Sequence, residues 1–480
     1  MIFCFKAKDY LCSYLNFALK LLNVKIKMNI KPHYLLLDGL RGAAALMVLW
    51  YHVFEGFAFA GGTAIETFNH GHLGVDFFFM LSGFVISYAY DDRWKKCRDV
   101  TPVASQNVTP VASNVNSQQP TANGLSIGSF FKRRLIRLHP MVVMGAVIGL
   151  ITYLIQGGVQ WDGVQVSFHW IMVAFFLGMC LIPVYPGAPY DVRGNGEMYP
   201  LNGPSWSLFF EYVGNILYAL FIRRLSNKML ALLCGATGML WVAFVVFDVS
   251  GYDMIGIGWT LDTVNFLGGL LRMLFPFTLG MLMARNFNKS PRHQDTETPS
   301  RDVTPVASQN VTPVASNVNR QQTTDNRLCP DLSNSATQQL SNSVTSKGIF
   351  WISVVVLFVL FSMPYIPKTG SVSVNGIYEL ACIICVFPLI IWFGAAANIT
   401  NAFTTKICKF LGDISYPLYI VHYPVMYLFY SWLIKNELYT LGETWQVVIL
   451  VMAVNIALAY ACLKLYDEPV RRRLDKTPRH

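Results

Sequence analysis

The segment LLLDGLRGAAALMVLWYHVF, residues 35–54, combines a long apolar run with two basic side chains. A helix of this length covers about 30 Å, which is the thickness of the hydrocarbon core of a bilayer. Ionisable residues inside such a span are costly and usually face the protein interior. The segment therefore predicts a transmembrane helix over 36–57 that directs Arg41 and His52 into a protein interior.

Arg41 and His52 are eleven residues apart in this segment. At about 100° per residue they fall within about 20° of each other on one helix face, separated by about 16 Å along the axis. Asp38 lies on nearly the same face. An imidazole that titrates near neutral pH can act as a base, but a buried histidine can also be a packing residue. The spacing leaves both interpretations open.

The rest of the chain repeats this apolar pattern. The 480 residues are 54% hydrophobic and 13% charged, whereas a soluble domain carries about 25% charged residues. We predict an all-α, polytopic transmembrane helical bundle of about ten spans, so a lipid bilayer is an expected partner. The expected crossings are 36–57, 72–90, 138–156, 205–222, 229–248, 265–284, 348–366, 376–396, 410–431 and 446–466. A further apolar run, 166–185, is expected to be a re-entrant or interfacial helix.

Two polar loops interrupt the bundle. RDVTPVASQNVTPVASNVN occurs at 98–116 and again, unchanged, at 301–319. Its low content of large apolar residues predicts disorder over 98–126 and 301–346. The flanking segments are basic, so the positive-inside rule predicts that both loops lie in the cytoplasm. The net charge of +10 is then a signal of topology and does not indicate nucleic acid.

With ten crossings, both termini are also expected in the cytoplasm. Residues 1–33 form an expected N-terminal extension, and Met28 is an alternative start. The membrane domain is expected to occupy 34–473, followed by a cytoplasmic tail over 474–480.

Two further spans carry acidic side chains. Asp76, in GVDFFFMLSGF, could pair with Arg41 or His52, or could be a charge at a helix end. In PSWSLFFE, Ser207 and Glu211 are one turn apart and share a face, and Glu211 needs a partner in lipid.

Two clusters can be read either as scaffold or as site. Three arginines precede the third span and either fix the topology or bind an anionic ligand bidentately: Arg133, Arg134 and Arg137. A polar stripe recurs every three residues in the ninth span and either packs or contacts a substrate: Tyr416, Tyr419 and His422. Cys382 and Cys385 lie in an apolar helix, where packing is expected, so neither a metal site nor a permanently bound cofactor is predicted.

Five motifs in this order resemble the acyltransferase family 3 membrane proteins: LDGLRGAAALMVLWYH, GVDFFFMLSGFVIS, RRLIRLHP, PSWSLFFE and LGDISYPLYIVHYPV. The resemblance covers about 34–473. It implies a ten-helix domain that O-acylates carbohydrates. Arg41 and His52 match the family's basic residue, ten residues, histidine signature. Trp206, Ser207 and Glu211 match its Trp-Ser-Leu-plus-acid motif, although Phe209 and Phe210 replace the usual pair before the acid.

We therefore expect an acyltransferase of the bacterial cytoplasmic membrane, with acetyl-CoA as donor and a carbohydrate or lipid-linked glycan as acceptor. His52, Arg41, Asp76 and Glu211 are the candidate catalytic residues, and the three arginines are the candidate CoA site. Trp206, Ser207 and the polar stripe of the ninth span are candidate substrate contacts. His52 could be a general base or a covalent acyl carrier. The alternative function is a glycolipid or polysaccharide transporter or flippase, which would also need buried charges.

Overall fold

A computed structural model describes residues 34–95, 125–289, 348–366, 368, 373–397, 399 and 401–475. The contacts divide the chain into two units, and the helices described here belong to the unit His33–Asn288 with Ile349–His480. The N-terminal extension, the repeats and most of the tail lie outside the described residues. Within them the secondary structure is helical, as predicted, with two isolated β-bridges between loop residues.

The principal helices are α2 (Leu35–Phe59), α3 (Leu73–Lys95), α4 (Ile127–Ile155), α5 (Phe168–Met179), α6 (Ser205–Leu220), α7 (Asn227–Val246), α8 (Thr263–Lys289), Gly348–Phe361, α10 (Val374–Ala381), α11 (Phe387–Ala396), α12 (Ala402–Asn436), α13 (Leu441–Cys462) and α14 (Glu468–Asp475). The π-helical turns η3 (Cys382–Val386) and η4 (Leu463–Asp467) make α10–α11 and α13–α14 continuous.

Every expected crossing is helical. By length and composition, 8 helices can cross a membrane among the described residues. The two remaining candidates are α12, whose tyrosines, histidine and prolines make it less apolar, and the shorter helix Gly348–Phe361. The run 166–185 contains α5, which has 12 residues and is too short to span a bilayer. This agrees with the prediction of a helix that does not cross.

The helix of the third expected crossing extends beyond 138–156 at its start. It begins at Ile127, because Ser126 caps it there by accepting a hydrogen bond from the Ser129 amide at 3.1 Å. The arginine-rich segment is therefore part of α4 and has a fixed orientation.

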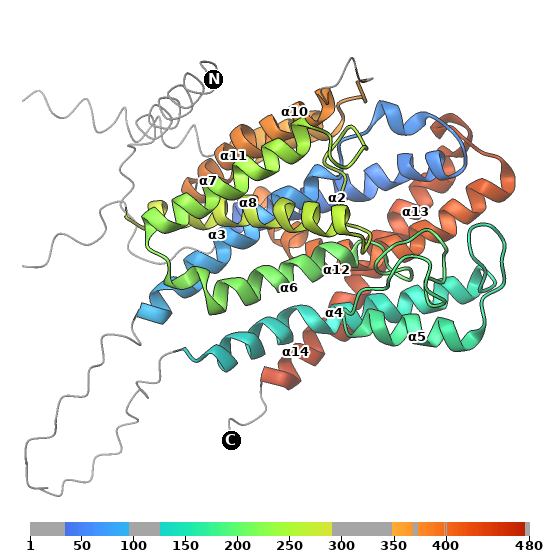
Figure 1. Ribbon diagram of the computed structural model, residues 1–480, viewed down its shortest axis with the longest axis horizontal. Coiled ribbons are helices and arrows are strands. Elements are labelled where there is room, and N and C mark those ends of the chain that lie inside the picture. Colours follow the sequence, from blue (N-terminus) through green and yellow to red (C-terminus); the bar gives the residue numbers. More distant parts are fainter. Residues whose placement is uncertain are drawn as a thin grey trace, which may run out of the picture. The chain divides into compact units, whose positions relative to one another are not determined.

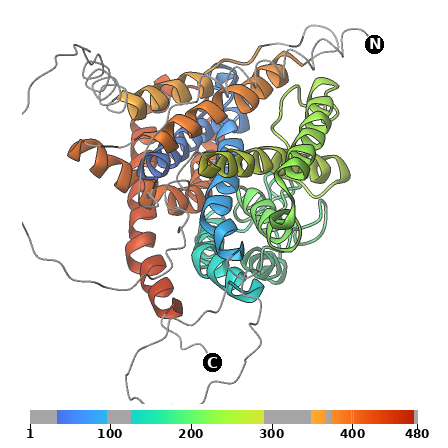
Figure 2. The same cartoon turned by 90° about the vertical axis from the view of Figure 1, so that its left-hand side faces the viewer.

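Small residues allow the central helices to approach closely, as is common between membrane helices. A Cβ at Gly42 of α2 would lie 2.2 Å from the Leu411 carbonyl oxygen of α12. A Cβ at Gly83 of α3 would lie 1.9 Å from the Phe277 carbonyl oxygen of α8. The most extensive helix contact in the described chain joins α2 and α12 (Figure 1). Figure 2 shows α3 between the green and teal helices on one side and the orange and red helices on the other.

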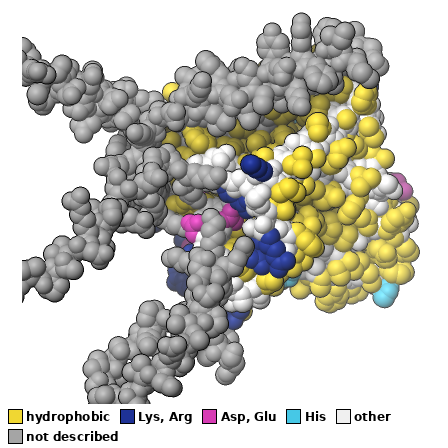
Figure 3. Space-filling model, turned by 60° about the vertical axis from the view of Figure 1, so that its left-hand side comes forward, with side chains coloured by type: hydrophobic (Ala, Val, Ile, Leu, Met, Phe, Trp, Pro, Cys, Tyr) yellow, Lys and Arg dark blue, Asp and Glu magenta, His cyan; other side chains and the backbone are white. Residues whose placement is uncertain are grey.

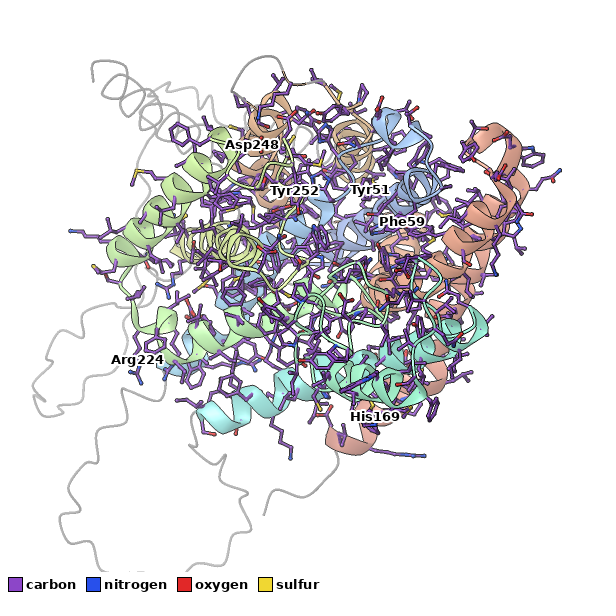
Figure 4. The ribbon with its side chains drawn as sticks, turned by 45° about the vertical axis from the view of Figure 1, so that its right-hand side comes forward. Tyr51, Phe59, His169, Arg224, Asp248 and Tyr252 are labelled. Atoms are coloured by element: carbon purple, nitrogen blue, oxygen red, sulfur yellow. The ribbon has the colours of Figure 1, made fainter. Side chains whose placement is uncertain are left out.

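The two ends of this bundle differ in charge. One end, here called the basic end, carries the termini of α3, α4, α6 and α8, with Arg133, Arg223 and Arg224. Lys and Arg side chains gather beside a broad apolar surface in Figure 3. The opposite end, here called the loop end, is built from the connections 60–72, 180–204 and 247–262 and from the described segment 362–366. These connections bond to each other, for example Tyr365 N–H to the Glu66 carbonyl at 2.7 Å. Figure 4 shows Phe59 and Arg224 at opposite ends.

Candidate functional site

A cavity of about 690 Å³ opens near the basic end. Its walls come from α2, α3, α4, α6 and α12, with η4 and α14 at the mouth. Many of the predicted site residues line it: Arg41, Arg134, Arg137, Ser207, Glu211, Tyr416 and Tyr419. Phe78, Phe79 and Ser82 of α3 line it too, so the fold brings residues of all five sequence motifs to one cavity.

Arg41 is fixed inside this cavity by several contacts. Its guanidinium lies 3.1 Å from the Asp38 carboxylate, which confirms the shared face predicted from the sequence. It also donates to the Ser415 hydroxyl at 2.9 Å and the Gly412 carbonyl at 3.3 Å, both on α12. These contacts orient the cation toward the cavity.

The three arginines of α4 differ in burial and in contacts. Arg134 is 6% exposed and lies 3.0 Å from Glu211 of α6, which supplies the partner that Glu211 was expected to need. Arg137 lines the cavity and remains exposed. Arg133 is exposed but is not among the residues that line the cavity in the described chain. Arg133 and Arg137 are one helical turn apart and share a face of α4, so Arg133 lies one turn before the cavity, nearer the start of the helix.

The cavity holds five basic and five acidic side chains, so its net formal charge is near zero. Three of the cations are already paired, as Arg41 with Asp38, Arg134 with Glu211, and Arg471 with Asp467 at 2.6 Å. Arg137 and Lys409 make no ion pair with another described residue. An anionic ligand would therefore meet these two cations first.

His52 lies beyond the cavity, in the half of α2 nearer the loop end. Its Nδ1 is 2.7 Å from Glu55 Oε2, one turn further along the same helix. The same carboxylate oxygen accepts hydrogen bonds from Tyr430 at 2.8 Å and Tyr423 at 3.1 Å. A carboxylate only accepts, so Nδ1 carries a proton, and in the neutral imidazole Nε2 then presents a lone pair. This arrangement suits a general base.

The polar stripe of α12 connects the cavity to His52. Tyr416 donates to the Leu138 carbonyl at 2.6 Å, and Tyr419 shares a 2.7 Å hydrogen bond with Ser207. The next member, His422, stacks on His52 with ring centroids 5.2 Å apart. His422 Nδ1 donates to the Leu418 carbonyl at 3.1 Å, while its buried Nε2 has no partner in the described chain. The stripe thus runs from the cavity wall to the candidate base.

Of the two alternatives for Asp76, a pair with Arg41 or His52 is not formed, whereas the position in the first turn of a helix, α3, is confirmed. Asp76 is 0% exposed and makes a bidentate pair with Arg272 of α8 at 2.8 and 3.0 Å. Trp206 packs against this pair, with its ring 5.2 Å from the Arg272 guanidinium, and does not line the cavity. Asp76 and Trp206 therefore contribute to the packing of α3, α6 and α8, and neither lines the cavity.

Sequence reasoning missed three charged partners. Glu55 was detectable as an acid one turn after His52, and Arg272 as a lone arginine within an apolar span. Glu197 carried no local signal because it lies in the irregular connection 180–204, where only tertiary contacts reveal its burial.

Glu197 is buried at the loop end, where Tyr427 donates a hydrogen bond to its carboxylate. Burial raises the pKa of Glu197 to about 7, although the Tyr427 hydrogen bond and the charge of Arg193 oppose this shift. A carboxyl with a raised folded pKa binds its proton more tightly in the native state. The free energy of unfolding should therefore fall as pH rises from about 4.5, the ordinary pKa of a glutamate, to about 7, the pKa of Glu197 in the folded protein. The total decrease should be at most about 3 kcal/mol, and stability should level off above pH 7.

This prediction can be checked by thermal unfolding of the purified protein between pH 5 and 8. Relative to Glu197→Gln, the wild-type Tm should decrease as pH rises. Parallel Tm profiles for the two proteins would contradict the assignment.

Comparison with known proteins identifies the family of the chain. The family model described as "Acyltransferase domain", of acyltransferase family 3, matches residues 34–464. The chain is similar to "Protein 2 in picA locus" of Rhizobium radiobacter, with 30% identity over 217 residues, covering 43% of this chain and 91% of that protein. It is also similar to "Acyltransferase MdmB" of Streptomyces mycarofaciens, with 25% identity over 265 residues, 52% of this chain and 56% of that protein. No solved structure matches the chain. The described helices and the matched family together show that this chain belongs to the family 3 membrane acyltransferases, enzymes that transfer acyl groups other than amino-acyl groups.

Proposed function

We propose that this protein moves an acetyl group from acetyl-CoA to a hydroxyl of a carbohydrate or lipid-linked glycan in a bacterial inner membrane. The donor enters the cavity from the basic end, which faces the cytoplasm by the positive-inside rule, as do both termini. The acceptor enters from the loop end. The observation that carries the proposal is the His52–Glu55 pair, because His52 stacks on His422 of the polar stripe, whose Tyr416 and Tyr419 line the cavity.

The cavity suits a cofactor-sized anionic ligand. Its volume of about 690 Å³ lies within the usual range for small-molecule sites. Arg137 and Lys409 supply unpaired positive charge for the CoA phosphates, and Arg41 lies deeper on the donor side. The sequence suggests Arg133, Arg134 and Arg137 as the binding site for acetyl-CoA. Of these, only Arg137 both lines the cavity and lacks an ion-pair partner among the described residues, and Lys409 joins it.

The proposed reaction follows from the His52 tautomer. Nε2 takes the proton of the acceptor hydroxyl as its oxygen attacks the thioester carbonyl. The C–S bond then breaks, and the sulfur of CoA leaves with the proton returned from the imidazolium. Glu55 stabilises that imidazolium through Nδ1. If His52 instead attacks the thioester itself, an acyl-histidine forms first, and trapping of labelled enzyme without acceptor distinguishes the two routes.

Aromatic side chains at the loop end support a carbohydrate acceptor. Phe59 stacks on Tyr430 at 5.0 Å between ring centroids and contacts Trp161 at 5.6 Å. Phe59 is 37% exposed, so this cluster is accessible beside His52. Tyr and Trp combine an apolar face with a polar group, which suits the mixed surface of a sugar.

The direct test uses proteoliposomes with labelled acetyl-CoA and candidate lipid-linked glycans. Label should appear in the glycan and be released as acetate by mild base. Movement of the glycan across the bilayer without transfer of label would instead support the transporter alternative. Family membership favours transfer over transport.

The donor site gives a separate prediction. Arg137→Gln combined with Lys409→Gln should raise the KM for acetyl-CoA roughly tenfold or more with little change in kcat, because charge-assisted hydrogen bonds contribute about 1.5–3 kcal/mol. Arg133→Gln is the matched control, since it removes a charge from the same helix outside the cavity. An equal change in KM for both variants would mean that only the general surface charge matters.

A further inference from the structure

Three potential metal ligands meet near the loop end, apart from the cavity. His70 and His72 lie just before α3, and Glu379 lies in α10. Glu379 Oε1 is 2.8 Å from His70 Nδ1 and 2.7 Å from His72 Nε2. The three ligand atoms all lie within 4.8 Å of one another. Residues more than 300 positions apart in the chain are thus brought to one point.

The protonation of His72 presents a conflict. Its Nδ1 lies 3.2 Å from the Asn69 carbonyl oxygen, and its Nε2 faces the Glu379 carboxylate. Both neighbours are acceptors, but a neutral imidazole has only one N–H. With Nδ1 donating to Asn69, a lone pair on Nε2 faces a carboxylate oxygen, and Nε2 has no hydrogen bond in the described chain. Either a second proton or a cation must resolve this contact.

The surroundings hold the three ligands in place. Glu379 is 0% exposed and its second oxygen accepts the Ile255 N–H at 2.6 Å. His70 is 1% exposed and packs against the Tyr378 ring at 4.9 Å. The Asn69 carbonyl orients His72 from the rear. Metal-binding histidines usually donate their other N–H to a carbonyl or carboxylate in this way.

We propose that His70, His72 and Glu379 bind a divalent transition metal, with Zn²⁺ as the first candidate. Two imidazoles and one carboxylate are a ligand set that Zn²⁺ accepts, with a fourth position left for water. The metal would replace the Nε2–carboxylate contact with bonds of about 2.0–2.2 Å, which requires the present 2.7 and 2.8 Å contacts of the carboxylate oxygen with the imidazole nitrogens to lengthen by about 0.5–0.7 Å. The metal ion would supply a positive charge next to the buried carboxylate of Glu379.

The site would connect three segments at the loop end: the turn before α3, the connection 247–262 through Ile255, and α10. It also lies next to the proposed active site without being part of it. The Tyr51 ring contacts the His72 ring at 5.8 Å and the His52 ring at 5.2 Å. The metal would therefore stabilise the wall behind His52, and this role does not depend on which acyl group or acceptor is used.

The test is the metal content of the full-length protein, purified in detergent without chelator and measured by plasma mass spectrometry. We expect about one zinc per chain, its removal by EDTA, and its return on addition of Zn²⁺. His72→Gln and, separately, His70→Gln should lose at least about nine-tenths of the metal. His169→Gln, which changes an exposed histidine of α5, is the matched control and should retain it.

Thermal unfolding supplies a second readout that does not use activity. EDTA should lower the Tm of the wild type, Zn²⁺ should restore it, and His72→Gln should respond to neither. If the wild type binds no zinc, cobalt or manganese after reconstitution, or if His72→Gln binds as much as the wild type, the proposal is wrong. His72 would then be an imidazolium paired with Glu379.

Discussion

Replacing His52 with glutamine is expected to reduce acyl transfer by at least about a hundredfold, because general-base catalysis contributes about 10²–10⁴-fold. Glutamine retains hydrogen-bonding capacity and approximate size, so it can still contact Glu55 and stack near His422. An amide cannot accept the hydroxyl proton. The loss corresponds to roughly 3–5 kcal/mol of activation barrier.

The measurement is acetate released from the purified glycan, alongside an immunoblot of the membrane fraction. His169→Gln, on the exposed side of α5, is the matched control and should retain full activity. Glu55→Gln should give a smaller loss than His52→Gln, because it removes the orienting carboxylate but leaves the imidazole. Near wild-type transfer by His52→Gln would make His52 a packing residue and would remove the base from the mechanism.

The second large effect concerns the folded state. Asp76→Ala should destabilise the protein by about 3–5 kcal/mol, because it leaves the Arg272 guanidinium buried without its carboxylate. Most of the protein should then be lost from the membrane fraction. The double change Asp76→Leu with Arg272→Met replaces the whole pair with apolar side chains and should restore the protein level.

The double variant also separates packing from catalysis at Asp76, which the sequence made a candidate catalytic residue. If the restored protein transfers acetyl groups, the carboxylate acts through helix packing. If it is abundant, binds acetyl-CoA and is inactive, Asp76 has a catalytic role that its present contacts do not explain. Protein abundance from quantitative immunoblots and transfer from labelled acetyl-CoA are the two measurements.

The sequence determined the helical membrane fold and the location of its helices, because a span of about 20 apolar residues has few alternatives in lipid. It also placed Arg41 and Asp38 on one face, since the helical period fixes which residues of a single helix are neighbours. Family motifs identified His52 as the candidate base. All of these inferences depend on local sequence or on order along the chain.

Pairing between helices required the tertiary structure. The sequence alone left several cations as possible partners of Asp76. The close contact of α3 with α8 in the folded protein makes Arg272 its partner. The arginines of α4 looked equivalent in the sequence, but the packing of α4 buries Arg134 and places Arg137 on the cavity wall, while Arg133 lies one turn earlier and outside the cavity. The His70–His72–Glu379 cluster had no signal at all, because its members are distant in sequence and meet only through packing. Local pattern fixes a helix and its faces, whereas the partner of each face depends on which helices pack together.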